Sequence, residues 1–292
     1  MIELRVAESD ADLELWRQVR LTVLPYEPCA PVAELRRTAT PGSLFVLAFR
    51  DGELAGSGLT GRSEIGGSFV APRVLPEHRR RGVGEALLSA LAGHAHSLGF
   101  ELARAKADDP GSFAFAERFG FAEVGREVEF VREVGAREPA PEGFQIVSLA
   151  ERPELHMRAY EEVAVESFLD MPTAGPISIT AEDWRREWLD WPEASFVALD
   201  GDEVIGCVGL LRDPDHPDRA AHSLTAVRRD HRRGGVGRAL KQQTIAWASA
   251  NGIRELATWT QSGNEAMQGL NRSLGYVVRN TSISVARVLP LA

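Results

Sequence analysis

The chain of 292 residues has only two cysteines, and they fall in different halves, at Cys29 and Cys207. A disulfide framework is therefore excluded as the basis of the fold, and a reducing cytoplasm is the compartment we expect. No apolar run reaches the length that a membrane span requires. Residues 1–5 lack the charged start and apolar stretch of a secretory signal, so we expect no membrane partner.

Metal-ligand patterns and a basic surface are also missing. Neither His-Glu-x-x-His nor paired Cys-x-x-Cys occurs, so the sequence predicts no metal site. The formal net charge is −9, which argues against a protein that coats nucleic acid. Arginine-rich turns on such an acidic body favour a small anionic ligand instead. For the assembled state we expect a monomer or a homodimer.

What the chain does contain is material for hydrophobic cores, since 44% of its residues are hydrophobic and 26% are charged. The length of 292 residues favours two domains. Residues 137–143, Arg-Glu-Pro-Ala-Pro-Glu-Gly, combine prolines and charges without periodicity and are typical of a linker. We therefore expect an N-terminal domain of residues 1–138 and a C-terminal domain of residues 139–292.

One stretch occurs twice, once in each expected domain. Residues 74–84 read Val-Leu-Pro-Glu-His-Arg-Arg-Arg-Gly-Val-Gly, and residues 227–237 read Val-Arg-Arg-Asp-His-Arg-Arg-Gly-Gly-Val-Gly. The copies lie 153 positions apart, and the same offset separates Gly99 from Gly252, the stop signals of the helices that follow. This ungapped match indicates two copies of one domain.

The elements around the repeat follow the same order in both halves. In the first half we expect strands at 2–6, 44–49, 53–59, 68–74 and 101–106, helices at 10–24 and 112–119, and closing strands at 121–124 and 127–134. In the second half we expect strands at 145–148, 195–199, 203–211, 222–227 and 255–260, helices at 153–168, 181–189 and 264–274, and closing strands at 276–279 and 282–288. A further helix runs from each glycine motif to Gly99 or Gly252.

A strand that feeds a glycine-rich turn and a helix N-terminus is suited to binding phosphate, because unpaired N–H groups and the helix dipole point at the turn. Three readings of this motif compete. A Walker loop needs Gly-Lys-Ser/Thr, which neither copy has. A dinucleotide-binding turn needs a third glycine where Leu87 and Leu240 stand. The third reading, an acyl-coenzyme A pyrophosphate loop, needs Arg/Gln-x-x-Gly-x-Gly/Ala between a strand and a helix, and both copies have it.

The third pattern carries a family resemblance. In the first half it consists of Val74, Arg79-x-x-Gly82-x-Gly84 and Phe119-Gly120-Phe121; in the second it consists of Thr225-x-Val227, Arg232-x-x-Gly235-x-Gly237, Asn264, Met267, Asn271 and Leu274-Gly275-Tyr276. Both halves resemble GCN5-related N-acetyltransferases (GNATs), and the element order matches across nearly the whole chain. The tandem arrangement is similar to that of two-domain actinobacterial members, those of the mycothiol synthase type among them.

The resemblance implies an α/β fold of the α+β type. Each of two tandem GNAT domains would be a mixed, mostly antiparallel sheet flanked by helices, with its fourth and fifth strands splayed apart. The pantetheine arm of the coenzyme would lie in the gap, where exposed backbone groups near Val74 and Val227 can pair with its amides.

The resemblance also implies acetyl-CoA as the cofactor. Its binding residues would be Val74, Arg79, Arg80, Arg81, Gly82, Val83 and Gly84 in the first half, and Thr225, Ala226, Val227, Arg232, Arg233, Gly234, Gly235, Val236, Gly237 and Asn264 in the second.

Acetyl transfer to an amine requires an acceptor without its extra proton, a donor to the tetrahedral oxyanion and a proton for the leaving thiolate. The family often uses a glutamate base where this chain has Ala221, and a tyrosine acid where it has Asn271 and, in the first half, Ala116. His222 is an alternative base, although a histidine at a sheet edge also serves as structure.

Two further residues complete the set of catalytic candidates. Asn271 is expected to donate to the thiolate or orient substrate, or simply to cap a loop. Asp170 lies where the family closes over its acceptor, so it is expected to bind an amine, or to end a helix.

The leading interpretation is a cytoplasmic N-acetyltransferase that moves an acetyl group from acetyl-CoA to a small-molecule or peptide amine by direct attack in a ternary complex. The C-terminal half is favoured as catalytic, because it combines Thr225, Asn264 and Asn271. The alternative is a catalytically degenerate acyl-CoA sensor or scaffold. A nucleic-acid binder that uses the arginine turns is the third and least favoured interpretation.

Overall fold

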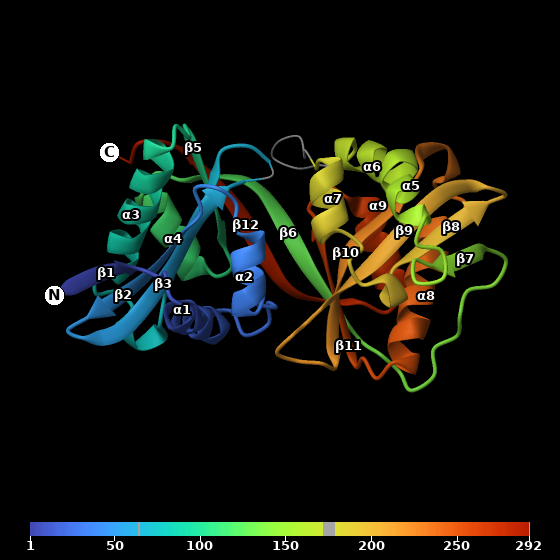
Figure 1. Ribbon diagram of the computed structural model, residues 1–292, viewed down its shortest axis with the longest axis horizontal. Helices are drawn as coiled ribbons and strands as arrows, with labels where there is room; N and C mark the ends of the chain where they lie inside the picture. Colours follow the sequence, from blue (N-terminus) through green and yellow to red (C-terminus); the bar gives the residue numbers. More distant parts are fainter. Residues whose placement is uncertain (64, 172–178, 292) are drawn as a thin grey trace. The chain divides into compact units, whose positions relative to one another are not determined.

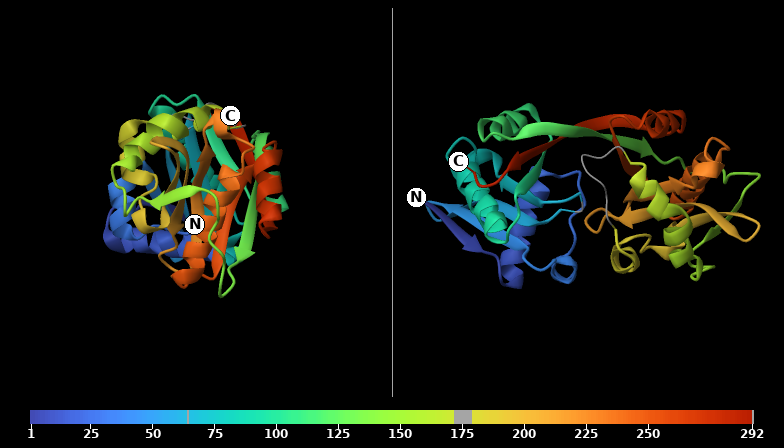
Figure 2. Two further views of the ribbon diagram at one scale, coloured as in Figure 1. Left: turned by 90° about the vertical axis from the view of Figure 1, so that its right-hand side faces the viewer. Right: turned by 90° about the horizontal axis from the view of Figure 1, so that it is seen from above.

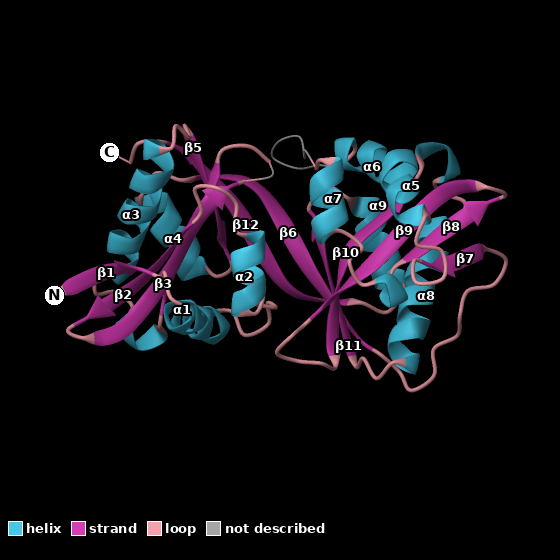
Figure 3. Ribbon diagram, in the orientation of Figure 1, coloured by secondary structure: helices cyan, strands magenta, loops and turns pink. Residues whose placement is uncertain are grey.

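The computed structural model describes residues 1–63, 65–171 and 179–291, and its elements follow the order expected from the sequence (Figures 1 and 3). The strands are β1 (Ile2–Val6), β2 (Leu44–Arg50), β3 (Glu53–Arg62), β4 (Ser68–Val74), β5 (Leu102–Ala107), β6 (Ala122–Glu133), β7 (Gln145–Ser148), β8 (Phe196–Asp200), β9 (Glu203–Arg212), β10 (Arg219–Val227), β11 (Glu255–Gln261) and β12 (Val277–Val288). The α-helices are α1 (Asp10–Val23), α2 (Val32–Thr38), α3 (Val83–Ser97), α4 (Pro110–Arg118), α5 (Leu155–Ala159), α6 (Val165–Leu169), α7 (Ala181–Glu187), α8 (Val236–Ala250) and α9 (Glu265–Ser273).

Short helical turns complete the fold. Three are 3-10 turns, η1 (Pro76–His78), η3 (Pro192–Ala194) and η4 (Arg229–His231), and η2 (Tyr160–Ala164) is a π-helical turn between α5 and α6. The single helix expected at 153–168 is therefore three consecutive helical segments, and its interior departs from α-helical hydrogen bonding at η2.

The described chain forms two compact units. Unit 1 consists of Met1–Gly125 and Ser282–Ala292, and unit 2 consists of Arg126–Thr281. The strands of unit 1 lie in the order β1-β2-β3-β4-β5-β12, and those of unit 2 in the order β7-β8-β9-β10-β11-β6. Each sheet is antiparallel except for one parallel pair, β4 with β5 and β10 with β11. The mixed, mostly antiparallel sheets flanked by helices that we expected are confirmed.

In each unit the sheet separates two hydrophobic layers, because successive strand residues point to opposite faces. In β2, Val46 and Ala48 belong to the cluster that contains α3, whereas Leu47 belongs to the cluster that contains α1. In β8, Phe196 and Ala198 pack with α8, whereas Val197 and Leu199 pack in the cluster that contains Trp184 of α7. The helix that follows the glycine motif thus covers the same face in both units.

The closing strands differ from the prediction. We expected two strands at 121–124 and 127–134, and two more at 276–279 and 282–288, but each pair is one uninterrupted strand, β6 and β12 (Figure 2). Residues 127–133 of β6 pair with β11 of unit 2, and residues 283–288 of β12 pair with β5 of unit 1. The breaks expected at 125–126 and 280–281 are absent, because long-range pairing keeps both segments extended.

The compact units consequently exchange their last strands relative to the sequence repeat. The division into residues 1–138 and 139–292 follows the duplicated segments and remains a prediction about them. The units instead change over within strands, at Gly125 and at Ser282.

Candidate functional site

The parallel strand pair at the centre of each sheet opens into a splay. In unit 2, β10 and β11 are in register from Arg219–Glu255 to Ala221–Ala257, although β10 continues to Val227. In unit 1 only Ser68–Ala103 and Phe69–Arg104 of β4 and β5 are in register. Beyond these pairs the facing edges leave backbone N–H and C=O groups without a neighbouring strand. The splayed fourth and fifth strands that we expected are thus present in both units.

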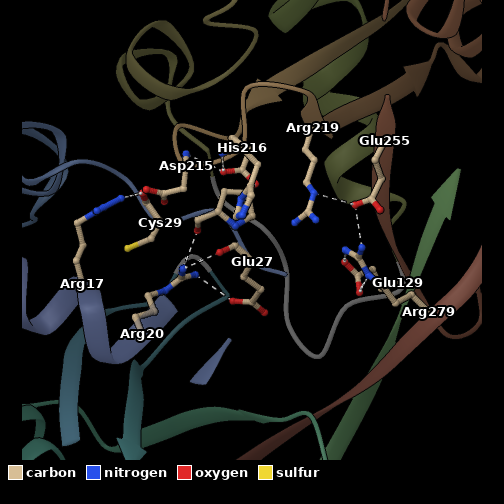
Figure 4. A network of polar contacts seen from close by, with 12 residues as sticks. Arg17, Arg20, Glu27, Cys29, Glu129, Asp215, His216, Arg219, Glu255 and Arg279 are labelled. Carbon is tan, nitrogen blue, oxygen red and sulfur yellow. Dashed lines mark hydrogen bonds and ion pairs between the residues drawn. The ribbon is translucent and has the colours of Figure 1, made fainter. Parts of the chain in front are cut away.

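An ion-pair network holds the paired end of the splay in unit 2 (Figure 4). Arg279 donates to both carboxylate oxygens of Glu129, at 2.6 and 3.0 Å, and to Glu255 at 2.9 Å. Arg219 of β10 lies 3.9 Å from the same Glu255 carboxylate of β11. Because these side chains join β6, β10, β11 and β12, they fix the point from which the strands diverge.

The glycine motif has the same backbone geometry in both copies. Gly82 (φ 84°) and Gly235 (φ 91°) are the left-handed N-cap residues of the 15-residue helices α3 and α8. Two residues earlier, Arg80 and Arg233 also have positive φ angles, of 59° and 64°. Such alternation turns successive N–H groups toward one point and forms an anion-binding concavity. No side chain in the described part of the chain caps either helix, so these N–H groups remain available to a phosphate.

The first arginine of each motif is tied to the strand that precedes it. Arg79 Nε donates to the carbonyl of Val74 at 3.3 Å, and Arg232 Nε donates to that of Val227 at 2.9 Å. This contact fixes the strand end against the turn in both copies. The outward part of each guanidinium can then face an anion beside the helix N-terminus.

In the second motif the arginines donate hydrogen bonds to carboxylates of α6 and its end, and no such bond is found for Arg79, Arg80 or Arg81 among the described residues. Asp170, which ends α6, accepts hydrogen bonds from Arg229 at 2.5 and 2.9 Å and from Arg232 at 2.6 Å. Glu166 accepts the backbone N–H of Arg229 at 2.7 Å. The hydrogen bonds from Arg229, more than those from Arg232, lower the pKa of Asp170 to about 2. Asp170 therefore lies on the phosphate turn rather than beside His222 or Asn271, and residues 172–178 of the loop that follows it lie outside the described residues.

The other residues expected to bind the cofactor lie at the end of β10 and at the start of α9. Thr225, Ala226 and Val227 lie on the part of β10 that has left β11, and the Thr225 hydroxyl is buried with no hydrogen-bond partner among the described residues. Asn264 is the N-cap of α9, where its Oδ1 accepts the N–H of Met267 at 3.2 Å. Its side-chain amide N–H groups remain for another contact.

A β-bulge in β10 distinguishes the strand from β4. Its register against β9 shifts between His222 and Leu224, so one extra residue is inserted there. The pairing of β4 with β3 runs without interruption from Val74 to Ser68. A bulge re-aims the residues on either side of it. As a result His222, opposite Leu210, occupies the place that Val70, opposite Thr60, occupies in unit 1.

His222 belongs to a buried group of polar side chains. Its Nε2 lies 2.8 Å from the hydroxyl oxygen of Tyr276, and its Nδ1 is buried with no partner in the part of the chain that the structure describes. The Lys241 ammonium lies 5.2 Å from the centre of the Tyr276 ring and 3.5 Å from the Thr258 hydroxyl. Burial, and secondly the nearby Lys241, hold the pKa of His222 well below its usual value.

Asn271 lies in the same layer. It is fully buried, and its Nδ2 donates to the Thr260 hydroxyl at 3.1 Å. Its Oδ1 has no hydrogen-bond partner among the described residues. A buried amide oxygen without a donor costs roughly 1–3 kcal/mol, which favours a polar ligand or water beside it.

Unit 1 replaces this entire group by apolar side chains. We call the group in unit 2 the polar core; it consists of His222, Lys241, Thr244, Thr258, Thr260, Asn271 and Tyr276. The matching positions of unit 1, taken from the strand registers, the helix offset and the closing motif, are Val70, Leu88, Leu91, Ala105, Ala107, Ala116 and Phe121. The same fold can therefore pack without any of these polar groups.

Sequence reasoning missed most of the polar core. It identified His222 and Asn271 but neither Lys241 nor the threonines of α8 and β11. The signal was present, because the offset of 153 places Lys241 opposite Leu88 in an otherwise apolar helix face.

The Cys207 thiol, the stacked tryptophans and the acidic side chains that the structure describes do not form a competing nucleophile or metal site. Burial raises the pKa of the Cys207 thiol to about 12, so it is not a nucleophile near neutral pH. Trp184 and Trp188 stack at 6.0 Å within the core cluster of α5 to α7. Within residues 1–63, 65–171 and 179–291, no three His, Cys, Asp or Glu side chains are grouped to hold a metal ion. None of the helices described is long and apolar enough to span a membrane.

Comparison with known families gives one result for both halves. The acetyltransferase (GNAT) family model matches residues 11–121 and again residues 157–276. A mycothiol acetyltransferase of Geodermatophilus obscurus is 30% identical over 277 residues, covering 89% of this chain and 88% of that protein. A mycothiol acetyltransferase of Actinosynnema mirum is 32% identical over 264 residues, covering 85% and 86%.

Solved structures share the fold across the whole chain. A GCN5-related N-acetyltransferase from Sphaerobacter thermophilus aligns with a TM-score of 0.79 at 18% identity, covering 98% of this chain and 95% of that one. A tandem GNAT protein from the clavulanic acid biosynthesis pathway aligns with a TM-score of 0.76, also at 18% identity, covering 99% and 98%. At this identity the likeness concerns the fold alone.

Proposed function

Because this chain belongs to the acetyltransferase (GNAT) family, we propose that it transfers an acetyl group from acetyl-CoA to the amine of a small molecule, with unit 2 as the catalytic unit. The observation that carries this assignment is the polar core. It places a histidine and an asparagine under the splay of unit 2, each with a buried atom that has no partner among the described residues, where unit 1 has valine and alanine. Buried polar groups are costly, so they indicate a site rather than packing.

Acetyl-CoA would bind with its pyrophosphate on the glycine motif. The uncapped helix N-terminus, the left-handed Gly235 and the guanidinium of Arg232 supply N–H donors around one point. The pantetheine amides would pair with the edge of β10 from Thr225 to Val227, as an added strand does. Unit 1 has the same turn at Arg79 to Gly84, so it would bind coenzyme without turnover.

The chemistry requires a base, and His222 is the proposed one. Its imidazole is uncharged near neutral pH because burial lowers its pKa. With Nε2–H donating to the Tyr276 oxygen, the lone pair on Nδ1 could accept the proton of the attacking amine. A backbone N–H of the splayed strand would donate to the tetrahedral oxyanion. Asn271 would orient the thiolate or the acceptor through its amide.

The transfer would be direct, in a ternary complex. A covalent intermediate needs an activated nucleophile, and the Cys207 thiol is buried with a raised pKa. A small-molecule acceptor is supported by the relatives that are named mycothiol acetyltransferases. Asp170 stays a candidate contact of the acceptor, but its bonds to Arg229 and Arg232 favour a role at the phosphate turn.

Matched glycine variants test which unit works. Gly82→Glu and Gly235→Glu each place a carboxylate in one turn and repel the pyrophosphate. We expect Gly235→Glu to abolish amine-dependent release of CoA and Gly82→Glu to retain it. Calorimetric titration with acetyl-CoA should then show one binding site lost in each variant. Activity lost only in Gly82→Glu would assign catalysis to unit 1, and absence of acetyl-CoA binding in the unmodified protein would contradict the proposal.

The alternative, a coenzyme sensor or scaffold without turnover, is favoured by two observations. Ala221 and Asn271 stand where the family often has a glutamate base and a tyrosine acid. In addition, Asp170 and Glu166 neutralise arginines of the second turn. A screen for CoA release with small amines separates the two functions, because sustained turnover with any amine excludes the sensor.

A further inference from the structure

Lysine is almost absent from this chain. Lys106 and Lys241 are its only two lysines, although lysine and arginine together number 33. Lys106 lies exposed on β5, whereas Lys241 lies in α8 with 0% of its surface exposed. In the part of the chain that the structure describes, Lys241 forms no ion pair. A chain that uses arginine for almost every surface cation thus keeps a lysine inside unit 2.

The side chain of Lys241 ends against the histidine and tyrosine of the polar core. Its Nζ lies 5.2 Å from the centre of the Tyr276 ring, and the Tyr276 hydroxyl contacts His222 Nε2 at 2.8 Å. Among the described residues Nζ makes one hydrogen bond, a long one of 3.5 Å to the Thr258 hydroxyl. Helix α8, strand β10 and the turn before β12 therefore bring three titratable groups together beneath the splay.

Packing does not require a lysine at this place. Leu88 occupies the matching position of α3, is 2% exposed and belongs to the core of unit 1. An unpaired buried amine destabilises a fold, whereas a buried leucine stabilises it. The reason for Lys241 must therefore be sought in its neighbours.

The charged surroundings single out Lys241 as the group that acts on His222. Arg132 of β6 pairs with Glu138 at 2.7 Å near Tyr276, and Arg272 of α9 lies over the Phe130 ring at 5.4 Å. Of the two charged side chains of α8, Lys241 is the one whose charge acts on the imidazole, whereas Arg238 donates to the Ser273 hydroxyl at 2.6 Å. Burial lowers the pKa of Lys241 to about 7, and burial followed by the charge of Lys241 lowers that of His222 further. As pH falls, the first proton taken by this pair goes to Lys241, and its charge then opposes protonation of His222.

We propose that Lys241 is a positioning residue of the catalytic site, which keeps the imidazole of His222 uncharged and held against Tyr276. His222 Nδ1 then stays able to accept a proton from the acceptor amine below neutral pH. This inference rests on the proposed function of His222 as the base. It adds that a second titratable group, on a different element, maintains the uncharged state of the base.

The test is a pair of NMR titrations that need no activity. Protein labelled with ¹³C-lysine gives two side-chain signals, and Lys241→Met assigns them. Imidazole signals of the seven histidines are followed in parallel, with His222→Gln for assignment. We expect the Lys241 signal to titrate near pH 7. In Lys241→Met, His222 should titrate at higher pH than in the unmodified protein. An unchanged His222 titration in Lys241→Met would overturn the inference.

Kinetics supply the functional arm. Removing the cation raises the proton affinity of His222, so the acid limb of kcat/KM should move to higher pH in Lys241→Met. We expect kcat/KM to fall several-fold at pH 6 and to stay within about twofold at pH 8.5. A uniform loss at all pH values would show a merely structural role and would also overturn the inference.

Two controls distinguish a failure of this inference from a failure of the proposed function. Leu88→Met makes the matched change in unit 1 and should leave both titrations and the pH profile unchanged. If His222→Gln retains full activity while Lys241→Met still shifts the His222 titration, the proposed base is wrong but the coupling of the two groups stands.

Discussion

Asp170 shows how one carboxylate can make two copies of the same turn chemically different. It accepts three hydrogen bonds from Arg229 and Arg232, which a coenzyme pyrophosphate would also contact. Because the folded pKa is about 2, below its ordinary 3.8, the stabilising contact is present above pH 4 and is lost as pH falls toward 2. Across the range in which an acetyltransferase works, the carboxylate stays charged. A pyrophosphate must therefore compete with it.

Asp170→Asn tests that competition. The amide keeps the shape of the side chain but removes its charge, so the arginines are released to the coenzyme. We expect acetyl-CoA to bind the second turn roughly 3- to 10-fold more tightly, measured by calorimetric titration. Asp202→Asn, in the exposed turn between β8 and β9, is the control and should leave the affinity unchanged. A raised KM for the acceptor amine, with an unchanged affinity for acetyl-CoA, would instead support Asp170 as a contact of the acceptor.

At the scale of single elements, the difference between β4 and β10 is one inserted residue. The shift between His222 and Leu224 is the only register irregularity between these strands and their antiparallel neighbours in the described sheets. A slip of one residue moves a side chain to the other face of a strand. The bulge thus allows His222 to face α8 while Val227 still meets the glycine motif in the same register as Val74.

Deletion of Ser223 should remove the β-bulge. The strand would then pair as β4 does, and His222 would stay opposite Leu210, because Ser223 is the extra residue of the bulge. We expect a folded protein that binds acetyl-CoA and keeps kcat/KM within roughly tenfold, because His222 stays in the place that Val70 has in unit 1. Ser223→Ala, which keeps the backbone length, should retain activity. A loss of about a hundredfold or more in the deletion variant, with activity kept in Ser223→Ala, would contradict this register argument and show that the bulge itself positions His222.

At the scale of the whole molecule, the strand exchange decides which segments can fold. Unit 2 contains residues 126–133 of β6, of which 127–133 pair with the full length of β11 and include the fully buried Phe130. A segment cut at the linker, residues 139–292, lacks that strand. It would expose the edge of β11 and leave Arg279 without its partner Glu129.

Two fragments test whether unit 2 needs its strand β6. Residues 126–281 should fold cooperatively and bind acetyl-CoA, since they contain unit 2 with its closing strand. Residues 139–292 should be aggregated or unfolded, as judged by thermal denaturation and amide NMR spectra. If residues 139–292 fold cooperatively and bind acetyl-CoA as well as residues 126–281 do, the exchanged strand is not needed for stability.

The sequence by itself determined the duplication, the element order and the two glycine turns, because these depend on local signals. Glycine at a left-handed N-cap, arginine before it and an apolar helix after it act over about ten residues, and the structure has the expected splayed sheets. Only the tertiary structure decided that β6 and β12 are single strands that close different units. An alternating sequence pattern predicts that a segment is a strand, but it does not determine which other strand that segment pairs with.

The same division applies to the site. His222 and Asn271 could be found because they stand beside family motifs, but their partners could not. Lys241, Thr258 and Tyr276 come from different elements, and a periodic helix pattern treats position 241 as one more core residue. The chemical role proposed for that lysine depends on its burial and on its distance of 5.2 Å from the centre of the ring of Tyr276, the hydrogen-bond partner of His222. Both quantities exist only once α8 is packed over the splay of β10 and β11.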